Sequence, residues 1–183
     1  MILDALAMSE FQPAGFGVLL GEEGMPLLEL ARKEAAMINV TTAFANMCHM
    51  DMWTWFGKDL SEDDEAVIAA CFRGCSQLEE LRLSSEPEHD GLGEDFLDIT
   101  FPMLEKVDLG GWTLPYSSAV GFAECQPKLK SAIFDNTLFL VEHGQDHLLA
   151  LEGDELDAKL TSTLRADIGL AGICAKYSSV ELF

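Results

Sequence analysis

The stretch Leu78-x-x-Leu81-x-Leu83 places apolar residues at its first, fourth and sixth positions. The same spacing returns in Leu104-x-x-Val107-x-Leu109 and in Leu129-x-x-Ala132-x-Phe134. The first residues of the three stretches are 26 and 25 residues apart. Such a period is typical of arrays in which each unit contributes one short strand and one return segment. We therefore expect parallel strands, with each unit burying its apolar side against its neighbours.

Less regular copies of the motif precede these three. Met50-x-x-Trp53-x-Trp55 begins 28 residues before Leu78, Met25-x-x-Leu28-x-Leu30 begins 25 residues earlier, and Leu3-x-x-Leu6-x-Met8 is the weakest copy. Helices are expected between the strands, over residues 33–47, 62–72 and 117–124, where small and aromatic residues supply an apolar side. The sequence predicts a single domain over residues 1–183, with its clearest units over 25–140.

The period becomes irregular after Leu140. Two later segments look like partial strands at shorter spacing, Leu149-x-Leu151-x-x-Asp154-x-Leu156 and Ile168-x-Leu170-x-x-Ile173-x-Ala175. An array of stacked units needs a cap, because an open end exposes core residues and a strand edge. Residues 141–183 are therefore expected to form either degenerate repeats or a C-terminal cap.

The pattern Phe72-x-x-Cys75-x-x-Leu78-x-x-Leu81-x-Leu83, with its later copies, resembles the leucine-rich repeat superfamily, closest to its ribonuclease-inhibitor-like and cysteine-containing subclasses. The resemblance implies an α/β solenoid with a curved parallel sheet on its concave side and helices or irregular turns on its convex side. It also implies a protein–protein interaction module, as in ubiquitin-ligase substrate receptors, inhibitors of basic enzymes and innate sensors. One departure puts the family's asparagine ladder in doubt: that position holds Lys58, Glu86, Trp112 or Thr137.

The charge of the chain is strongly negative. Thirty-two acidic residues against 11 basic ones give a formal net charge of −21. Such a field repels nucleic acids and anionic membrane surfaces and attracts basic proteins. A basic or mixed-charge protein partner is therefore expected. The alternative is that the acidic surface only keeps the protein soluble.

Five cysteines, an odd number without a C-x-x-C pair, predict reduced thiols and neither a disulfide framework nor a zinc ribbon. Cys75 and Cys125 directly precede strand motifs and are expected to face the core. No apolar run is long enough to cross a bilayer, and the first residues lack a secretory signal pattern. The sequence therefore predicts an intracellular protein, cytoplasmic or nuclear, that needs no cofactor.

Strict alternation along each strand predicts which side chains face away from the core. In the central units these are Glu80, Arg82 and Ser84, then Lys106, Asp108 and Gly110, and then Ser131, Ile133 and Asp135. In-register parallel stacking places Glu80 beside Lys106 and Arg82 beside Asp108, as a crossed pair of charges. Exposed ion pairs contribute little to stability, so simple compatibility of neighbouring strands also explains them.

The same alternation, applied to the unit that begins at Met50, sends Met52, Thr54 and Phe56 outward. Exposed methionine and aromatic side chains are typical anchors of a binding patch. A register shift of one residue would instead expose Trp53 and Trp55. The predicted partner-binding residues come from both groups: Met52, Thr54, Phe56, Glu80, Arg82, Lys106, Asp108 and Ile133.

Signals for chemistry are weak. His143 and His147 are four residues apart, a spacing that can bind a metal on a helix, but no third ligand follows by spacing and Gly144 weakens the helix. We therefore expect neither a catalytic nor a metal site. Two alternatives stay open: a metal-binding or enzymatic protein that uses the two histidines, with Cys174 as a distant contributor, and a structural fragment of a larger repeat scaffold.

Overall fold

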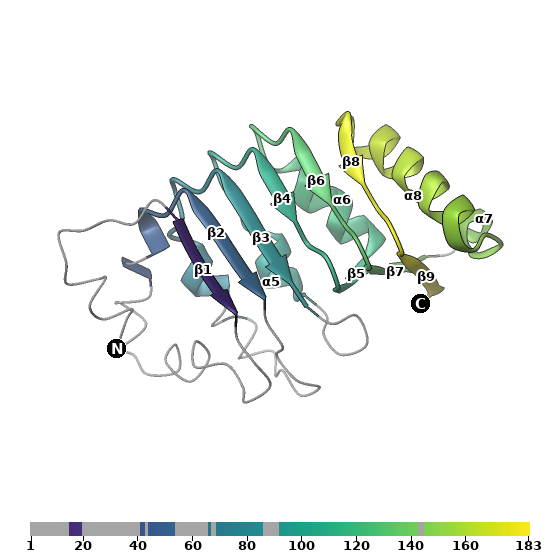
Figure 1. Ribbon diagram of the computed structural model, residues 1–183, viewed down its shortest axis with the longest axis horizontal. Coiled ribbons are helices and arrows are strands. Elements are labelled where there is room, and N and C mark those ends of the chain that lie inside the picture. The colour runs from purple at the N-terminus through teal and green to yellow at the C-terminus, as the bar shows by residue number, and fades with distance from the viewer. Residues whose placement is uncertain are drawn as a thin grey trace.

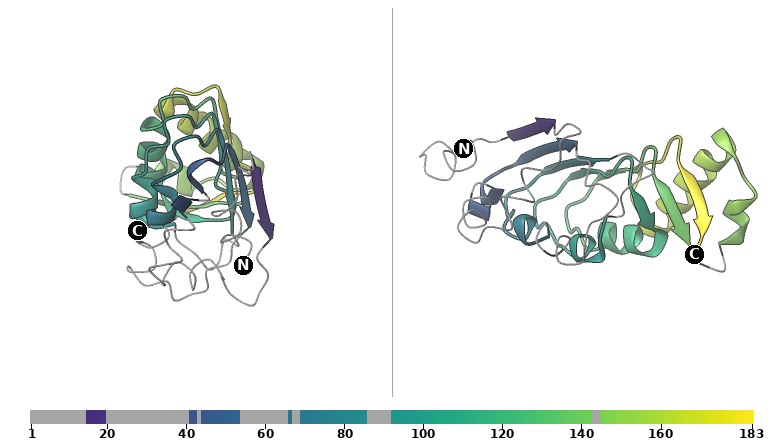
Figure 2. Two further views of the ribbon diagram at one scale, coloured as in Figure 1. Left: turned by 90° about the vertical axis from the view of Figure 1, so that its left-hand side faces the viewer. Right: turned by 90° about the horizontal axis from the view of Figure 1, so that it is seen from below.

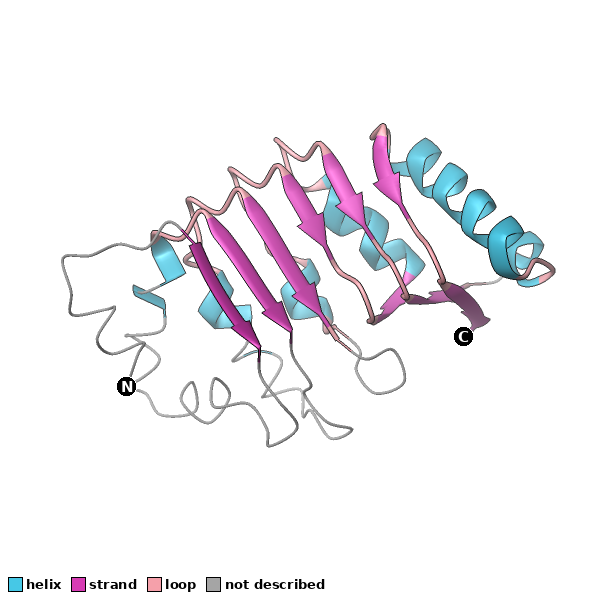
Figure 3. Cartoon of the chain, in the orientation of Figure 1, coloured by secondary structure: helices cyan, strands magenta, loops and turns pink. Residues whose placement is uncertain are grey.

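The computed structural model describes residues 15–19, 41–42, 44–53, 66, 69–85, 92–142 and 145–183. These residues form an α/β structure with two parallel sheets (Figure 1 and Figure 3). The larger sheet has six strands in the order β1-β2-β3-β4-β6-β8. Their bounds are Gly15–Leu19, His49–Trp53, Glu80–Ser84, Lys106–Asp108, Ser131–Ile133 and Gly172–Cys174.

The register of this sheet follows the apolar spacing seen in the sequence. Leu81 pairs with Val107, Val107 with Ala132, and Ala132 with Ile173, one strand after another. All four side chains are at most 4% exposed. The predicted parallel stacking of the three central motifs is therefore confirmed.

A second, three-stranded sheet was not predicted. β5 (Thr113–Pro115), β7 (Leu138–Val141) and β9 (Ser179–Leu182) pair in parallel, and each follows a strand of the larger sheet after a short turn. Its apolar side adds Leu114 and Phe139 to the core. Each of the last three units thus contributes one strand to each sheet.

The helices lie on one side of the six-stranded sheet (Figure 2). They are α5 (Glu94–Leu97), α6 (Tyr116–Glu124), α7 (Asp146–Leu149) and α8 (Gly153–Ile168). Beneath α5 and α6, the ring centroid of Phe96 lies 5.1 Å from that of Phe72 and 6.2 Å from that of Phe122. The helix expected over 117–124 is confirmed to within one residue.

Turns after the strands repeat one backbone conformation. Gly111, Asn136 and Tyr177 each follow the central core residue of their strand by four positions, and all three have positive φ, of 79°, 57° and 54°. Glycine adopts this left-handed conformation without cost, asparagine tolerates it and tyrosine rarely adopts it. The shared turn directs the chain from the first sheet into the second.

The residue after each of these turns donates a side-chain hydrogen bond to the previous strand. Trp112 Nε1 donates to the Leu83 carbonyl over 2.7 Å, Thr137 Oγ1 to the Leu109 carbonyl over 3.1 Å, and Ser178 Oγ to the Phe134 carbonyl over 2.8 Å. The three acceptors occupy equivalent positions. A ladder therefore exists where the absence of asparagine had put one in doubt, because indole N–H and hydroxyl groups supply the same donor.

Residues 141–183, expected to form degenerate repeats or a C-terminal cap, hold α7, α8, β8 and β9. Leu156, Leu160 and Leu164 of α8 are buried. Asp157, Thr161 and Arg165, one turn apart along α8, bind outward-facing backbone groups at and just after β8. Asp157 accepts from the N–H groups of Tyr177 and Ser178, Thr161 bonds both the N–H and the carbonyl of Ala175, and Arg165 donates to the Ile173 carbonyl. These bonds occupy an edge that would otherwise pair with another strand.

Two expectations about the N-terminal half are wrong. Met50 pairs with Leu81 and Met52 with Leu83, so the matching motif is Met47-x-x-Met50-x-Met52, three residues earlier than expected. The strand beside β2 is Gly15–Leu19, rather than the segment of Leu28 and Leu30. Residues 20–40, and the first copy at Leu3, lie outside the described part of the chain.

Among the described residues, no helix combines the length and apolar character needed to cross a membrane. The five cysteines are not joined in disulfides. Cys71 and Cys75 are buried, as expected for Cys75, but Cys125 is exposed. Cys125 ends α6 on its outer side, so its expected place in the core is wrong.

Burial of two thiols predicts a loss of stability at alkaline pH. Burial raises the pKa of Cys71 from 9.0 to about 11, and burial together with nearby Cys71 raises that of Cys75 to about 12. Because the folded-state pKa values are raised, this contribution is fully present below pH 9.0 and is lost as the pH rises toward these values. Urea unfolding should show a loss of about 1.4 kcal/mol per pH unit for each thiol.

The matched variants for this test are Cys75→Ala and Cys125→Ala. Cys75→Ala should flatten the alkaline slope, because it removes one buried thiol, whereas replacing exposed Cys125 should leave the slope unchanged. Equal slopes in both variants and the parent would contradict the assignment.

Candidate functional site

The side of the six-stranded sheet opposite the helices presents two rows of side chains, which follow from the strand register. The strand register aligns His49, Glu80, Lys106 and Ser131 in the first row. The second row holds Asp51, Arg82, Asp108 and Ile133. We call these eight residues the open face. Inward neighbours such as Leu81 and Val107 are buried, so alternation along the strands separates the open face from the core.

Charges in the first row form one connected chain. Lys106 Nζ donates a hydrogen bond to Glu80 Oε1, and His49 Nδ1 lies 3.4 Å from Glu80 Oε2. The Lys106 hydrogen bond is the main reason that the pKa of Glu80 is lowered, and the same bond raises the pKa of Lys106. Both groups are therefore held in their charged forms.

Charges in the second row centre on Arg82. Its Nε lies 3.3 Å from Asp108 Oδ2, and its Nη1 lies 3.8 Å from Asp51 Oδ2. Burial raises the pKa of Asp108, while Arg82 and a hydrogen bond from the Gly110 N–H oppose that rise. The crossed charge pairs expected from the sequence are thus present: Glu80 beside Lys106, and Arg82 beside Asp108.

The open face is hollowed and reaches solvent. A cavity of about 390 Å³ lies over it, lined by all eight open-face residues. The side chains of Arg82, Lys106 and Asp51 are 60%, 61% and 62% exposed, so their ends can contact another molecule. The ion pairs orient these side chains but add little to the stability of the fold, because exposed ion pairs contribute little to the free energy of unfolding.

Five of the predicted partner-binding residues meet on this face: Glu80, Arg82, Lys106, Asp108 and Ile133. Met52 does not, because it pairs with Leu83 and is only 2% exposed. The expectation that Met52 is an exposed anchor is therefore wrong. Thr54 and Phe56 lie outside the described residues.

Sequence reasoning missed His49 and Asp51, and it placed Ser131 on the outward side without counting it among the partner-binding residues. For the first two, the missed signal was the buried spacing Met47-x-x-Met50-x-Met52, whose flanking residues are His49 and Asp51. Because Trp53 and Trp55 are large apolar residues, the motif was matched to them, three residues too late in the chain. Ser131 begins β6 directly beside Lys106 but carries no charge to draw attention to it.

The open face offers ion pairs and hydroxyls, and its titratable groups do not form a metal-binding set. Across the described residues, no group of three histidine, cysteine or acidic side chains could hold a metal ion. His147 is exposed on α7, and His143 lies outside the described residues. The alternative based on these two histidines thus gains no support from the geometry.

No family model matches this chain, and neither a curated protein nor a solved structure matches it.

Proposed function

We propose that this protein is a leucine-rich-repeat-like solenoid whose open face binds a protein partner. The observation that supports this most is the contrast between the two sides of the six-stranded sheet. One side is packed under helices (Figure 2), whereas the other presents ion-paired side chains around a cavity. Side chains already held in ion pairs lose less conformational freedom on binding, which favours association.

The partner we propose is basic or of mixed charge. The open face holds Asp51, Glu80 and Asp108 against Arg82 and Lys106, and the whole chain carries −21. Long-range attraction would bring a cationic surface to the protein, and the alternating charges would then select its orientation. This division of roles predicts binding that weakens as salt is added.

The open face supports binding better than catalysis. Its cations are joined to carboxylates, and the face presents no cysteine nucleophile beside a base. Ser131 lies beside Lys106, which is itself bonded to Glu80 and held in its charged form. We therefore propose a non-enzymatic interaction module.

A matched pair of charge reversals tests this function. Glu80 and Glu105 are each bonded to a lysine, at Lys106 and Lys130, and are 44% and 41% exposed. Glu80 is on the open face, whereas Glu105 precedes β4 and does not line the cavity. We expect Glu80→Lys to reduce capture of partners from a source lysate about tenfold at about 50 mM salt, because it repels a cationic surface.

The control variant Glu105→Lys changes the net charge by the same amount. It should reduce capture by no more than about threefold, because only steering is affected. Equal losses in both variants would show that net charge alone attracts partners, and would contradict docking on the open face. Thermal unfolding of each variant checks that the fold is retained.

A further inference from the structure

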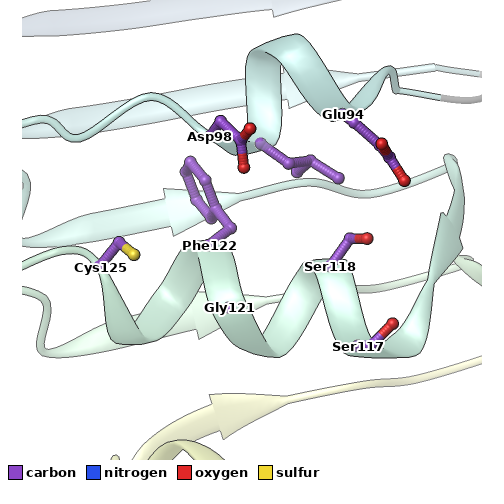
Figure 4. Close-up of a pocket in the computed structure, with 8 residues that line it drawn as sticks. Glu94, Asp98, Ser117, Ser118, Gly121, Phe122 and Cys125 are labelled. Carbon is purple, nitrogen blue, oxygen red and sulfur yellow. The ribbon is translucent and has the colours of Figure 1, made fainter.

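A second hollow lies on the opposite, helix-covered side of the molecule. A cavity of about 390 Å³ is lined by residues of α5 and α6, with Glu94 and Asp98 on one wall (Figure 4). Ser117, Ser118, Gly121 and Cys125 of α6 and its C-cap form the other wall. We call this the α5–α6 groove. It shares no lining residue with the open face.

The floor of the α5–α6 groove is apolar. Leu97 and Phe122 lie beneath it and are 3% and 1% exposed. Gly121 keeps the middle of the groove free, because a Cβ atom built there would have no neighbour within 4 Å outside its own helix. The aliphatic stem of a long side chain could therefore lie along α6 without displacing any group.

The rim of the α5–α6 groove carries negative charge that the described residues do not neutralise. Glu94 and Asp98 are one helical turn apart, a spacing at which like charges repel. Within the part of the chain that the structure describes, neither forms an ion pair; Arg73 approaches Asp95 instead, at 4.0 Å. A cation placed between the two carboxylates would relieve their repulsion.

The carboxyl end of α6 adds to this potential. A helix ends with partial negative charge, which basic residues usually offset. α8 has Arg165 in its last turn, but α6 has no basic residue there and ends at Glu124. Asp98 faces this end of α6, near Phe122 and Cys125 (Figure 4). Helix dipole and carboxylates thus favour a cation at the same place.

The chemistry favours an organic cation over a metal ion. Calcium and magnesium need six or more oxygen ligands or several retained waters. Two carboxylates and two hydroxyls offer fewer ligands, and no metal-binding set occurs among the described residues. A lysine or arginine side chain needs only an apolar surface for its stem and acceptors for its head.

We propose that the α5–α6 groove binds a lysine or arginine side chain of a partner polypeptide, with Asp98 as its main acceptor and Glu94 as the second. The stem lies over Leu97, Phe122 and Gly121. This site is independent of the open face, so one molecule presents two binding surfaces on opposite sides of its sheet.

The test uses the full chain and a fluorescent five-residue peptide with one central arginine between leucines. Lysine and glutamine versions of the peptide serve as the second cation and the neutral control. Fluorescence polarisation gives the affinity at about 20 mM and about 500 mM salt. We expect saturable binding of both cationic peptides, at least about tenfold tighter than that of the glutamine peptide.

Paired variants locate the binding. The double variant Glu94→Gln, Asp98→Asn should lose about tenfold in affinity. The charge-matched double variant Glu152→Gln, Glu155→Gln, on exposed positions of α8, should change it little. Gly121→Leu should block the groove, whereas Gly121→Ala should leave it mostly open.

Four results would overturn the proposal. The first is that the cationic peptides show no saturable binding up to millimolar concentration. The second is an equal loss of peptide affinity in the two double variants, and the third is unchanged peptide affinity of Gly121→Leu. The fourth is full displacement of the peptide by millimolar calcium at constant ionic strength. The open-face variant Glu80→Lys should change the peptide affinity of the groove by no more than about threefold, because Glu80 does not line the groove and acts on it only through the net charge of the protein. Failure of the groove and failure of the open face are therefore distinguishable.

Discussion

Gly111→Ala is expected to destabilise the protein by about 3 kcal/mol or more, with a fall in Tm of about 10 °C. A Cβ atom at this position would lie 1.7 Å from the carbonyl oxygen of Ser85, and the residue has a φ of +79°. The contact is with backbone, which cannot rotate away, so the two turns must separate. The left-handed conformation adds about 1–2 kcal/mol for a residue with a Cβ.

Gly121→Ala is the same chemical change at a position that tolerates it. Its Cβ would meet no neighbour within 4 Å outside its own helix, and alanine favours a helix over glycine by about 1 kcal/mol. Thermal unfolding should therefore show opposite shifts in Tm for the two variants. If Gly111→Ala unfolded within about 2 °C of the parent, the close approach of the turns at Gly111 and Ser85 would be contradicted.

Trp112→Ala is expected to cost about 4–5 kcal/mol in the free energy of unfolding. Trp112 is fully buried and is the largest fully buried side chain described. Its removal leaves a large cavity and deprives the Leu83 carbonyl of the indole donor at 2.7 Å. Both losses add, because the cavity cannot close without moving the strands on either side.

Trp112→Phe separates the two contributions. Phenylalanine keeps most of the apolar contact but has no N–H, so it should lose the hydrogen bond and only part of the packing. We expect a cost of about 1–3 kcal/mol in urea unfolding, well below that of alanine. If Trp112→Phe cost as little as an exposed substitution, the side-chain ladder would not stabilise the array.

The central strands could be predicted because their inner and outer positions differ sharply in chemistry. Glu80 and Arg82 alternate with Leu81 and Leu83, so only one register buries the leucines. The crossed pairs with Lys106 and Asp108 then follow from parallel stacking alone.

The unit at β2 could not be aligned in the same way. Its sequence runs from Met47 through Met50 and Met52 to two tryptophans, so several registers bury comparable apolar surface. Pairing with β3 decides between them, and this is a contact between segments about 30 residues apart in sequence. The wrong register placed Met52 on the predicted surface and left His49 and Asp51 out of it.

The donors of the ladder and the hydrogen bonds between α8 and β8 escaped prediction for a related reason. Trp112, Thr137 and Ser178 share no side-chain chemistry except a hydrogen-bond donor, so no residue pattern links them. The longer gap before β8 holds α8, whose Asp157, Thr161 and Arg165 read in the sequence as ordinary polar residues of a surface helix. Their role becomes visible only where β8 presents its unpaired edge.

The most direct test of the account is the affinity of a captured partner for the parent, Glu80→Lys and Glu105→Lys proteins, measured by titration calorimetry at low and high salt. Docking on the open face predicts a loss of about tenfold for Glu80→Lys, a much smaller loss for Glu105→Lys, and weaker binding of all three proteins in high salt. An unchanged affinity of Glu80→Lys, with its fold retained, would contradict the open face as the binding surface.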